Sequence, residues 1–148
     1  MHFTREFPFP HPLRLFVLIE NERPSIFFSA LAQALSADGV GVAAEQDWSC
    51  GVSAALGQLY AYTRARPPSR SLVDPLAAFA DAFSANPSDL QTAVRKAAEA
   101  AEATRDVEAR VGRSAYVETS LLKRERVPDP GAWGIKVLLE ALAAADGA

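Results

Sequence analysis

The sequence predicts an all-α fold of about five antiparallel helices, preceded by an irregular N-terminal segment. From residue 25 onward, apolar residues recur every three or four positions, the period of a helix with one buried face. Glycine and proline, which end helices, separate the periodic stretches. No alternation of single apolar and polar residues, the pattern of a half-buried strand, follows residue 24.

Residues 1–24 are the irregular segment, which we expect to be poorly ordered, as chain termini commonly are. Prolines at positions 8, 10 and 12 prevent a helix, and Leu13 to Ile19 suits a short extended piece. The rest, residues 25–148, is expected to form one helical domain, because a chain of 148 residues suffices for one domain of ordinary size.

The first two helices follow from caps and apolar spacing. Ser25, after Pro24, is expected to cap the first helix, which Asp38-Gly39 ends. The second helix is predicted from Glu45 to Tyr62. Its apolar residues predict one continuous buried face, made of Trp48, Val52, Ala55, Leu59 and Tyr62.

A loop must follow, because two consecutive prolines, Pro67-Pro68, forbid helix continuation. The third helix starts near Ser71, or else Asp74-Pro75 forms its cap and first turn. Its apolar stripe is Leu72, Leu76, Phe79 and Phe83.

The loop carries three arginines, Arg64, Arg66 and Arg70. They admit two interpretations: a solvated loop, or a basic surface that attracts a nucleotide or an acidic partner. No aromatic platform or wider basic patch accompanies them, so nucleic acid is not the expected ligand.

The fourth helix is predicted to be the longest. Ser88 with Gln91 three residues on is a capping-box pattern, and the helix should run to about Arg110. Gly112 then ends it, and the long connection 113–128 is of the kind that often forms a lid or binding loop. Its buried side is expected to be Leu90, Val94, Ala97, Ala101, Thr104, Val107 and Val111.

The final helix has a clear start, with Asp129 as its cap and Pro130 in its first turn. Four large apolar residues are expected to bury it: Trp133, Val137, Leu138 and Leu142. Trp48 and Trp133 are therefore both interpreted as core residues.

Composition excludes several classes of function. A net charge of −3 lacks the basic excess with which proteins bind nucleic acids or anionic membranes, so neither is an expected partner. The apolar run Leu15 to Ile19 is far shorter than the roughly 20 residues of a membrane-spanning helix. One cysteine, Cys50, and two histidines make neither an internal disulfide nor a zinc site. A cytoplasmic location is expected, since a single cysteine fits a reducing compartment.

Two polar motifs near the C-terminal end are candidates for function, because packing alone does not require them. Arg113 is either a phosphate clamp, for which its planar guanidinium is suited, or a solvated charge. Asp129-Pro130-Gly131 is either a plain N-cap or a polar corner where glycine lets a ligand approach the backbone. Taken alone, each motif leaves both alternatives open.

The combination of motifs is more specific. In order they are Ser25 to Gln33, Tyr60 to Leu76, Ala103 to Asp106, Gly112 to Tyr116, and Pro128 to Ala132. Their order and spacing resemble the nucleotide-binding (L) domain of dihydroxyacetone (glycerone) kinases, over roughly residues 25–147.

This resemblance implies an eight-helix barrel that binds ATP at one rim, of which the chain holds about five helices. The serine and leucine that open the third helix would lie near the nucleotide, and the arginine after the fourth helix would reach its phosphates. The corner that opens the last helix would border the adenosine end, and residues 114–128 would form a lid. The implied nucleotide-binding residues are Ser71, Leu72, Arg113, Asp129, Pro130 and Gly131.

The chain departs from the family in features that matter for catalysis. The family binds magnesium through a Gly-Asp-Gly-Asp-type segment and phosphate through a Gly-Gly-x-Ser-Gly turn, and the chain has neither. The separate domain that binds dihydroxyacetone through a histidine is also absent. Asp38, Glu45 and Asp47 are not spaced like metal ligands and are interpreted as helix-end charges. We expect an ATP-binding portion with no catalytic or metal-binding residue of its own and little or no kinase activity by itself.

An incomplete barrel should expose apolar stripes on the remaining helices. The expected partners are therefore a nucleotide and either a dihydroxyacetone-binding domain or a second copy of the chain. One alternative is a non-catalytic helical interaction protein that regulates a complete kinase. Another is a gene fragment, which an in-frame Gly-Asp-Gly-Asp segment upstream would establish.

Overall fold

The computed structural model describes residues 22–36, 44–108 and 126–146. Those residues form five α-helices and one short 3₁₀ helix, and no strand occurs among them. The all-α prediction is confirmed, whereas the closed barrel stays a prediction. The elements are α2 (Glu22–Ser36), α3 (Glu45–Tyr62), α4 (Val73–Ala85), α5 (Leu90–Ala103), η1 (Thr104–Asp106) and α7 (Pro130–Asp146).

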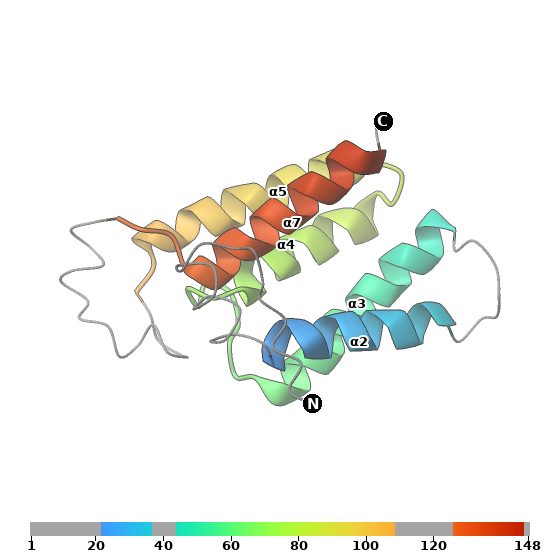
Figure 1. Cartoon of the computed structure of the whole chain (residues 1–148), viewed down its shortest axis with the longest axis horizontal. Helices are drawn as coiled ribbons and strands as arrows, with labels where there is room; N and C mark the ends of the chain where they lie inside the picture. The colour runs from blue at the N-terminus through green and yellow to red at the C-terminus, as the bar shows by residue number, and fades with distance from the viewer. Residues whose placement is uncertain (1–21, 37–43, 109–125, 147–148) are drawn as a thin grey trace, which may run out of the picture.

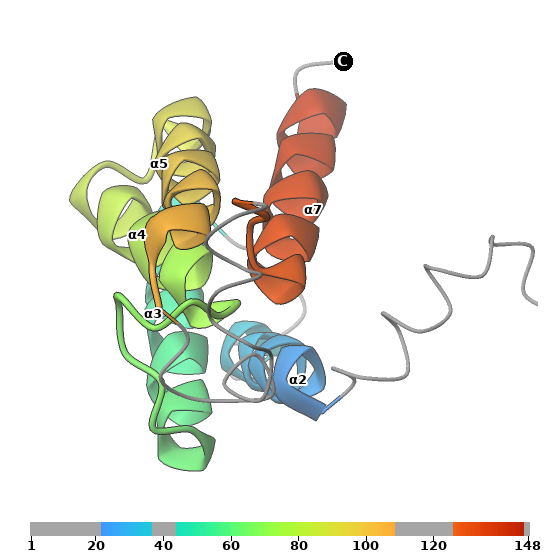
Figure 2. The same ribbon diagram turned by 90° about the vertical axis from the view of Figure 1, so that its left-hand side faces the viewer.

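The helices form two groups. Helices α4, α5 and α7 lie side by side with alternating direction, and α2 pairs with α3 in a second antiparallel layer (Figure 1). Helix α3 packs against α4, which joins the layers, while α7 packs mainly on α5 and less on α4. Seen from the end, α7 is at one edge of its layer and α2 lies below it (Figure 2).

The core is centred on α4, which packs against α3, α5 and α7. Leu59 of α3 and Val73 of α4 have no exposed surface, and Leu76 is 2% exposed. The rings of Phe79 and Phe83 stack with their centroids 5.4 Å apart. Burying each such side chain contributes about 1.5–3 kcal/mol, so the apolar stripe predicted for α4 holds this core together.

The buried side of α5 consists of small residues. Ala93, Ala97 and Ala101 recur every fourth position and are completely buried. Because the separation of packed helix axes depends on the side chains between them, alanines let neighbouring helices approach closely. Of the predicted buried side, Val94, Ala97, Ala101 and Thr104 are buried and Leu90 and Val107 are partly buried, while Val111 lies outside the described residues.

The predicted buried face of α7 is wrong. Its four large apolar residues are 37–55% exposed: Trp133, Val137, Leu138 and Leu142. The helix instead packs through Ala132 and Ala143, which are 0% and 4% exposed, together with Ile135 and the partly buried Leu139. Helix α7 thus packs through Ala132, Ile135, Leu139 and Ala143 and leaves the four predicted residues outward.

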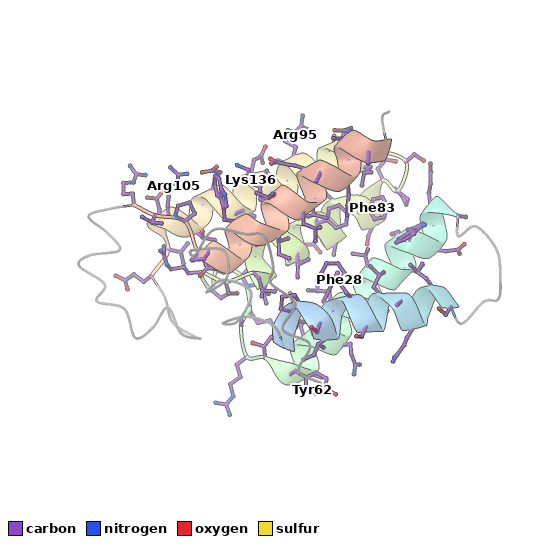
Figure 3. All side chains as sticks on the ribbon, viewed as in Figure 1. Phe28, Tyr62, Phe83, Arg95, Arg105 and Lys136 are labelled. Atoms are coloured by element: carbon purple, nitrogen blue, oxygen red, sulfur yellow. The ribbon has the colours of Figure 1, made fainter. Side chains whose placement is uncertain are left out.

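The ends of the α3 stripe are also exposed. Trp48 is 44% exposed and Tyr62 is 66% exposed, so neither is a core residue. Tyr62 projects away from the molecule (Figure 3). Only the middle of the stripe, Val52, Ala55 and Leu59, is buried.

Two helix starts differ from prediction. Helix α2 begins at Glu22 and not at Ser25, because Pro24 fits a first helical turn, whose N–H groups need no intrahelical partner. Helix α5 is capped by Asp89, whose Oδ1 accepts the Thr92 N–H at 2.9 Å. Ser88, predicted as the cap, donates its hydroxyl to Glu45 of α3 instead.

Helix α5 also ends earlier than predicted. It stops at Ala103, and the chain tightens into the 3₁₀ turn η1 before an extended Val107. Helix α3, with 18 residues, is longer than α5 with 14. Asp106, the last residue of η1, pairs with Arg126 at 2.8 Å.

Helices α2 and α3 approach closely at a glycine. A β-carbon on Gly51 would lie 3.2 Å from Leu31 Cδ1, tighter than ordinary van der Waals contact. The described helices include none long and apolar enough to cross a membrane.

Candidate functional site

The predicted nucleotide-binding residues fall at two helix starts. Ser71 and Leu72 immediately precede α4, whereas Asp129, Pro130 and Gly131 lie at the start of α7. Three of these side chains are nearly inaccessible: Ser71 is 7% exposed, Leu72 2% and Asp129 2%. Gly131 is buried as well, and Pro130 is exposed. The sixth predicted residue, Arg113, lies outside the described residues.

The segment before α4 is shaped by one carboxylate. Asp74, in the first turn of α4, accepts the N–H groups of Ser69 at 2.9 Å and Ser71 at 2.8 Å. Its Oδ2 also accepts the Ser69 hydroxyl at 2.9 Å. Hydrogen bonds to a carboxylate are stronger than neutral ones, and a buried carboxylate needs them. The helix therefore starts at Val73, between the two alternatives that the sequence left open.

The start of α7 uses a side-chain cap, as predicted. Asp129 Oδ2 accepts the Ala132 N–H at 3.0 Å, and Pro130 occupies the first helical position. The main-chain N–H of Asp129 donates in turn to the Thr104 hydroxyl at 2.8 Å. The cap is thus bound to the end of α5 as well as to its own helix.

Arg70 brings the two predicted segments together. Its Nη2 donates to the Val127 carbonyl, 57 residues further along the chain, at 2.7 Å. Its Nη1 donates to the carbonyls of Thr104 and, at 3.4 Å, Val107. Since Thr104 also binds Asp129, the turn before α4, the end of α5 and the start of α7 form one hydrogen-bonded junction.

The sequence missed this role of Arg70. Neither interpretation of the basic loop describes a guanidinium that is 3% exposed. Arg66 is also engaged: it donates to the carbonyls of Tyr60 and Thr63 at the end of α3 and lies 3.8 Å above the Tyr60 ring. Only Arg64 remains as an exposed cation without a role. No local signal distinguishes Arg70 from its two neighbours, because its acceptors are distant in sequence.

Two further ionisable groups, Tyr60 of α3 and Lys136 of α7, have defined partners. Burial raises the pKa of the Tyr60 phenol, although Arg66 opposes the rise, so this group stays neutral at physiological pH. Lys136 of α7 pairs with Glu102 of α5 at 2.8 Å and lies 4.0 Å from the Trp133 ring centre (Figure 3).

The predicted site residues fit a nucleotide only in part. The Ser71 hydroxyl and the Asp129 carboxylate are already hydrogen-bonded within the protein. They can shape a binding surface but have little free capacity to contact a ligand directly. Pro130, which is exposed, is the described site residue best placed to touch one.

A metal centre is not evident in the described ranges. Among them no three His, Cys, Asp or Glu residues gather as metal ligands would. Glu45 and Asp47 instead serve the helix starts, as interpreted from the sequence: Asp47 accepts the Ala44 N–H at 2.8 Å and Glu45 accepts Ser88. Asp38 lies outside the described residues.

One hollow of about 270 Å³ lies elsewhere, between α2 and α3. It contains none of the predicted site residues. Its polar lining comes from Ser25, Ser29, Gln33, Gln58 and Tyr62.

Comparison with known proteins identifies the family. A model of the DAK2 domain matches residues 24–144. The dihydroxyacetone kinase of Pichia angusta is 39% identical over 129 residues, covering 82% of this chain and 21% of that protein. Dihydroxyacetone kinase 2 of Saccharomyces cerevisiae is 38% identical over 127 residues, covering 83% and 21%. Human triokinase/FMN cyclase is 33% identical over 124 residues, covering 79% and 20%.

The chain therefore spans about a fifth of the length of these relatives. No solved structure matches it. Because the family model matches well over half of its residues, the chain belongs to the DAK2 domain family.

Proposed function

We propose that this chain is the ATP-binding portion of a dihydroxyacetone (glycerone) kinase and has little or no kinase activity by itself. The observation that best supports this is the junction of the two predicted nucleotide segments. The turn that ends in Ser71 and the helix start at Asp129 are far apart in sequence, yet both are hydrogen-bonded to Thr104, the turn through Arg70. Such convergence is what a single ligand that contacts both segments requires.

The chemistry of phosphoryl transfer explains the expected lack of activity. That reaction depends on positioning and on neutralising phosphate charge with metal ions and cations. Arg113 is proposed to supply the cation that contacts the phosphates. Magnesium would neutralise the phosphates in a complete site, but no described carboxylate cluster is available to hold it. A cytoplasmic location fits this proposal, because the cytosol contains ATP and keeps single cysteines reduced.

The test is equilibrium binding of a non-hydrolysable ATP analogue with magnesium to the full chain. Arg113→Ala should weaken binding about tenfold or more, because charge-assisted bonds to phosphate are among the stronger ones. Arg95→Ala is the matched control, since Arg95 is exposed on α5 and is not part of the junction. No binding by the unmodified chain would refute the proposal.

Activity is measured separately, with Mg-ATP and dihydroxyacetone. Turnover near ~1 s⁻¹, the low end for kinases, would contradict the expected inactivity. Adding a separately expressed dihydroxyacetone-binding domain asks whether a partner restores the reaction.

A second candidate function is a non-catalytic interaction protein, and the outer face of α7 favours it. Val137 and Leu142 are 52% and 55% exposed, and Trp133 beside them is 39% exposed. Exposed apolar residues gathered on one surface are typical of interaction sites. Partner binding or self-association without any binding of the ATP analogue would support this candidate over the first.

A further inference from the structure

Arg70 is an unusual cation because it is buried without an acidic partner. Its side chain is 3% exposed, and it forms no ion pair within the described ranges. Among the residues that the structure describes, its Nε has no hydrogen-bond partner. Its backbone has φ of 53°, in the left-handed region that costs a non-glycine residue conformational energy. Burial of the charge and backbone strain both oppose this arrangement, so the contacts that Arg70 makes must outweigh them.

Those contacts are carbonyl oxygens at the end of a helix. The Thr104 and Val107 carbonyls belong to and follow η1, which continues α5, and a helix C-terminus carries partial negative charge. Cations are stabilised there, and carbonyls left without intrahelical donors need a partner. The guanidinium therefore takes the place of a C-terminal cap for α5 and η1.

The third acceptor makes the contact more than a cap. The Val127 carbonyl belongs to the segment that enters α7, two residues before its cap Asp129. The planar guanidinium group of arginine holds its N–H donors in fixed directions. One side chain can therefore donate both to the end of α5 and to the approach to α7.

We propose that Arg70 is a positioning residue that holds the start of α7 at a fixed place beside the start of α4. The inference rests on the proposed function, because these are the two segments of the proposed nucleotide site. Arg70 does not touch the nucleotide. It acts through the Thr104, Val107 and Val127 carbonyls, which set where Asp129 and Gly131 lie.

A nearby ion pair provides a natural control. Arg126 Nη2 lies 2.8 Å from Asp106 Oδ1 and, like Arg70, connects the end of η1 to the approach to α7. Its side chains are 65% and 59% exposed, so water and salt compete with it. If joining the segments were enough, this pair would matter as much as Arg70.

The experiment compares Arg70→Lys with Arg126→Lys in the full chain. Both keep the positive charge and remove the planar fork. Hydrogen exchange is measured for the peptide that covers residues 127–135, and affinity for the magnesium-bound ATP analogue is measured in parallel. Arg70→Lys should speed local exchange about tenfold or more, by raising the population of open states, while Arg126→Lys changes it by less than about threefold.

Affinity should follow the same order, with a loss of about tenfold or more for Arg70→Lys, since small misplacements of positioning groups are costly. Val94→Ala serves as the stability control, because Val94 is buried in α5 and makes none of the junction's hydrogen bonds. The proposal is overturned if Arg70→Lys changes exchange and affinity no more than Val94→Ala does.

The two proposals fail in different ways. If the unmodified chain binds no nucleotide, the proposed function fails, and the exchange measurement still decides the role of Arg70. If the chain binds nucleotide and Arg70→Lys binds equally well, the positioning role fails alone.

A measurement on the unmodified chain guards against a variant that does not fold. With ¹⁵N-labelled arginine, one Nε–H resonance should exchange with water about tenfold more slowly than those of exposed arginines, because Arg70 Nε is sealed from solvent. Absence of any slowly exchanging Nε–H would overturn the buried placement, and with it the proposal.

Discussion

Replacing Thr104 by valine tests the hydrogen bond that fastens the start of α7 to the end of α5. Thr104 is 1% exposed, and its hydroxyl donates to the Ala101 carbonyl at 2.6 Å and accepts from the Asp129 N–H at 2.8 Å. Valine has nearly the same shape, so it removes both bonds while leaving little or no cavity.

The two lost bonds differ in cost. The Ala101 carbonyl keeps a partner, because the main-chain N–H of Thr104 also donates to it. The Asp129 N–H loses its acceptor in a residue that is 2% exposed. An unsatisfied buried donor costs about 1–3 kcal/mol, so the free energy of unfolding should fall by about 2 kcal/mol. For a domain of this size, the Tm should fall by about 5–10 °C.

Urea unfolding, followed by circular dichroism, measures the change. Thr104→Ser keeps the hydroxyl and removes only a methyl group, which costs about 1 kcal/mol, so it should be the less destabilised variant. If Thr104→Val unfolds within about 0.5 kcal/mol of the unmodified chain, the hydroxyl does not hold the junction together.

Three further predictions concern the helix ends and the outer face of α7. Asp129→Ala removes the α7 cap and should lower the free energy of unfolding by about 1 kcal/mol, whereas Asp129→Asn should lose less; equal losses would exclude a capping role. Thr92 hydrogen bonds lower the pKa of Asp89, so the stability that this cap contributes is complete above the ordinary Asp pKa of about 3.9 and is lost as the pH falls through the lower folded-state value. Thermal unfolding between pH 6 and pH 2 should therefore show a steeper acid loss for the unmodified chain than for Asp89→Asn, and parallel curves would contradict the assignment. Replacing Val137 and Leu142 together by glutamine should leave the Tm nearly unchanged and reduce self-association in light scattering; a monomeric unmodified chain at high concentration would refute the association itself.

Features with purely local causes could be predicted from the sequence. Helix α3 has the predicted bounds, and the Asp129 cap with Pro130 in the first turn is where the sequence places it. Both depend on residues within one helical turn of each other.

Features that depend on contacts between residues far apart in the sequence could not be predicted from it. Ser88 and Asp89 are both good caps by type, and the choice falls to Asp89 because Glu45, 43 residues away, takes the Ser88 hydroxyl. Similarly, the residues after Ala103 are suited to continue helix α5. The chain nevertheless turns there, where Arg70, 34 residues away in sequence, donates to the Thr104 carbonyl. The same long-range contacts build the candidate site, which explains why the sequence located its segments but missed Arg70.

The face of α7 posed a different difficulty. Between Gly131 and Ala145 the helix carries only two charged residues, Lys136 and Glu140. Apolar residues thus surround most of its circumference, and a period of 3.6 cannot select one face when nearly every face is apolar.

Packing made the selection that the sequence could not make. The alanine-lined side of α5 favours a neighbour with small side chains, so α7 turns Ala132 and Ala143 inward. Lys136 pairs with Glu102 of α5, so one of the few charges on this helix is also directed to the existing neighbour. The remaining face, which includes Val137 and Leu142, is apolar and open. A helix that is apolar nearly all round is normally buried on all sides. The outer face of α7 therefore has the character of an interaction surface.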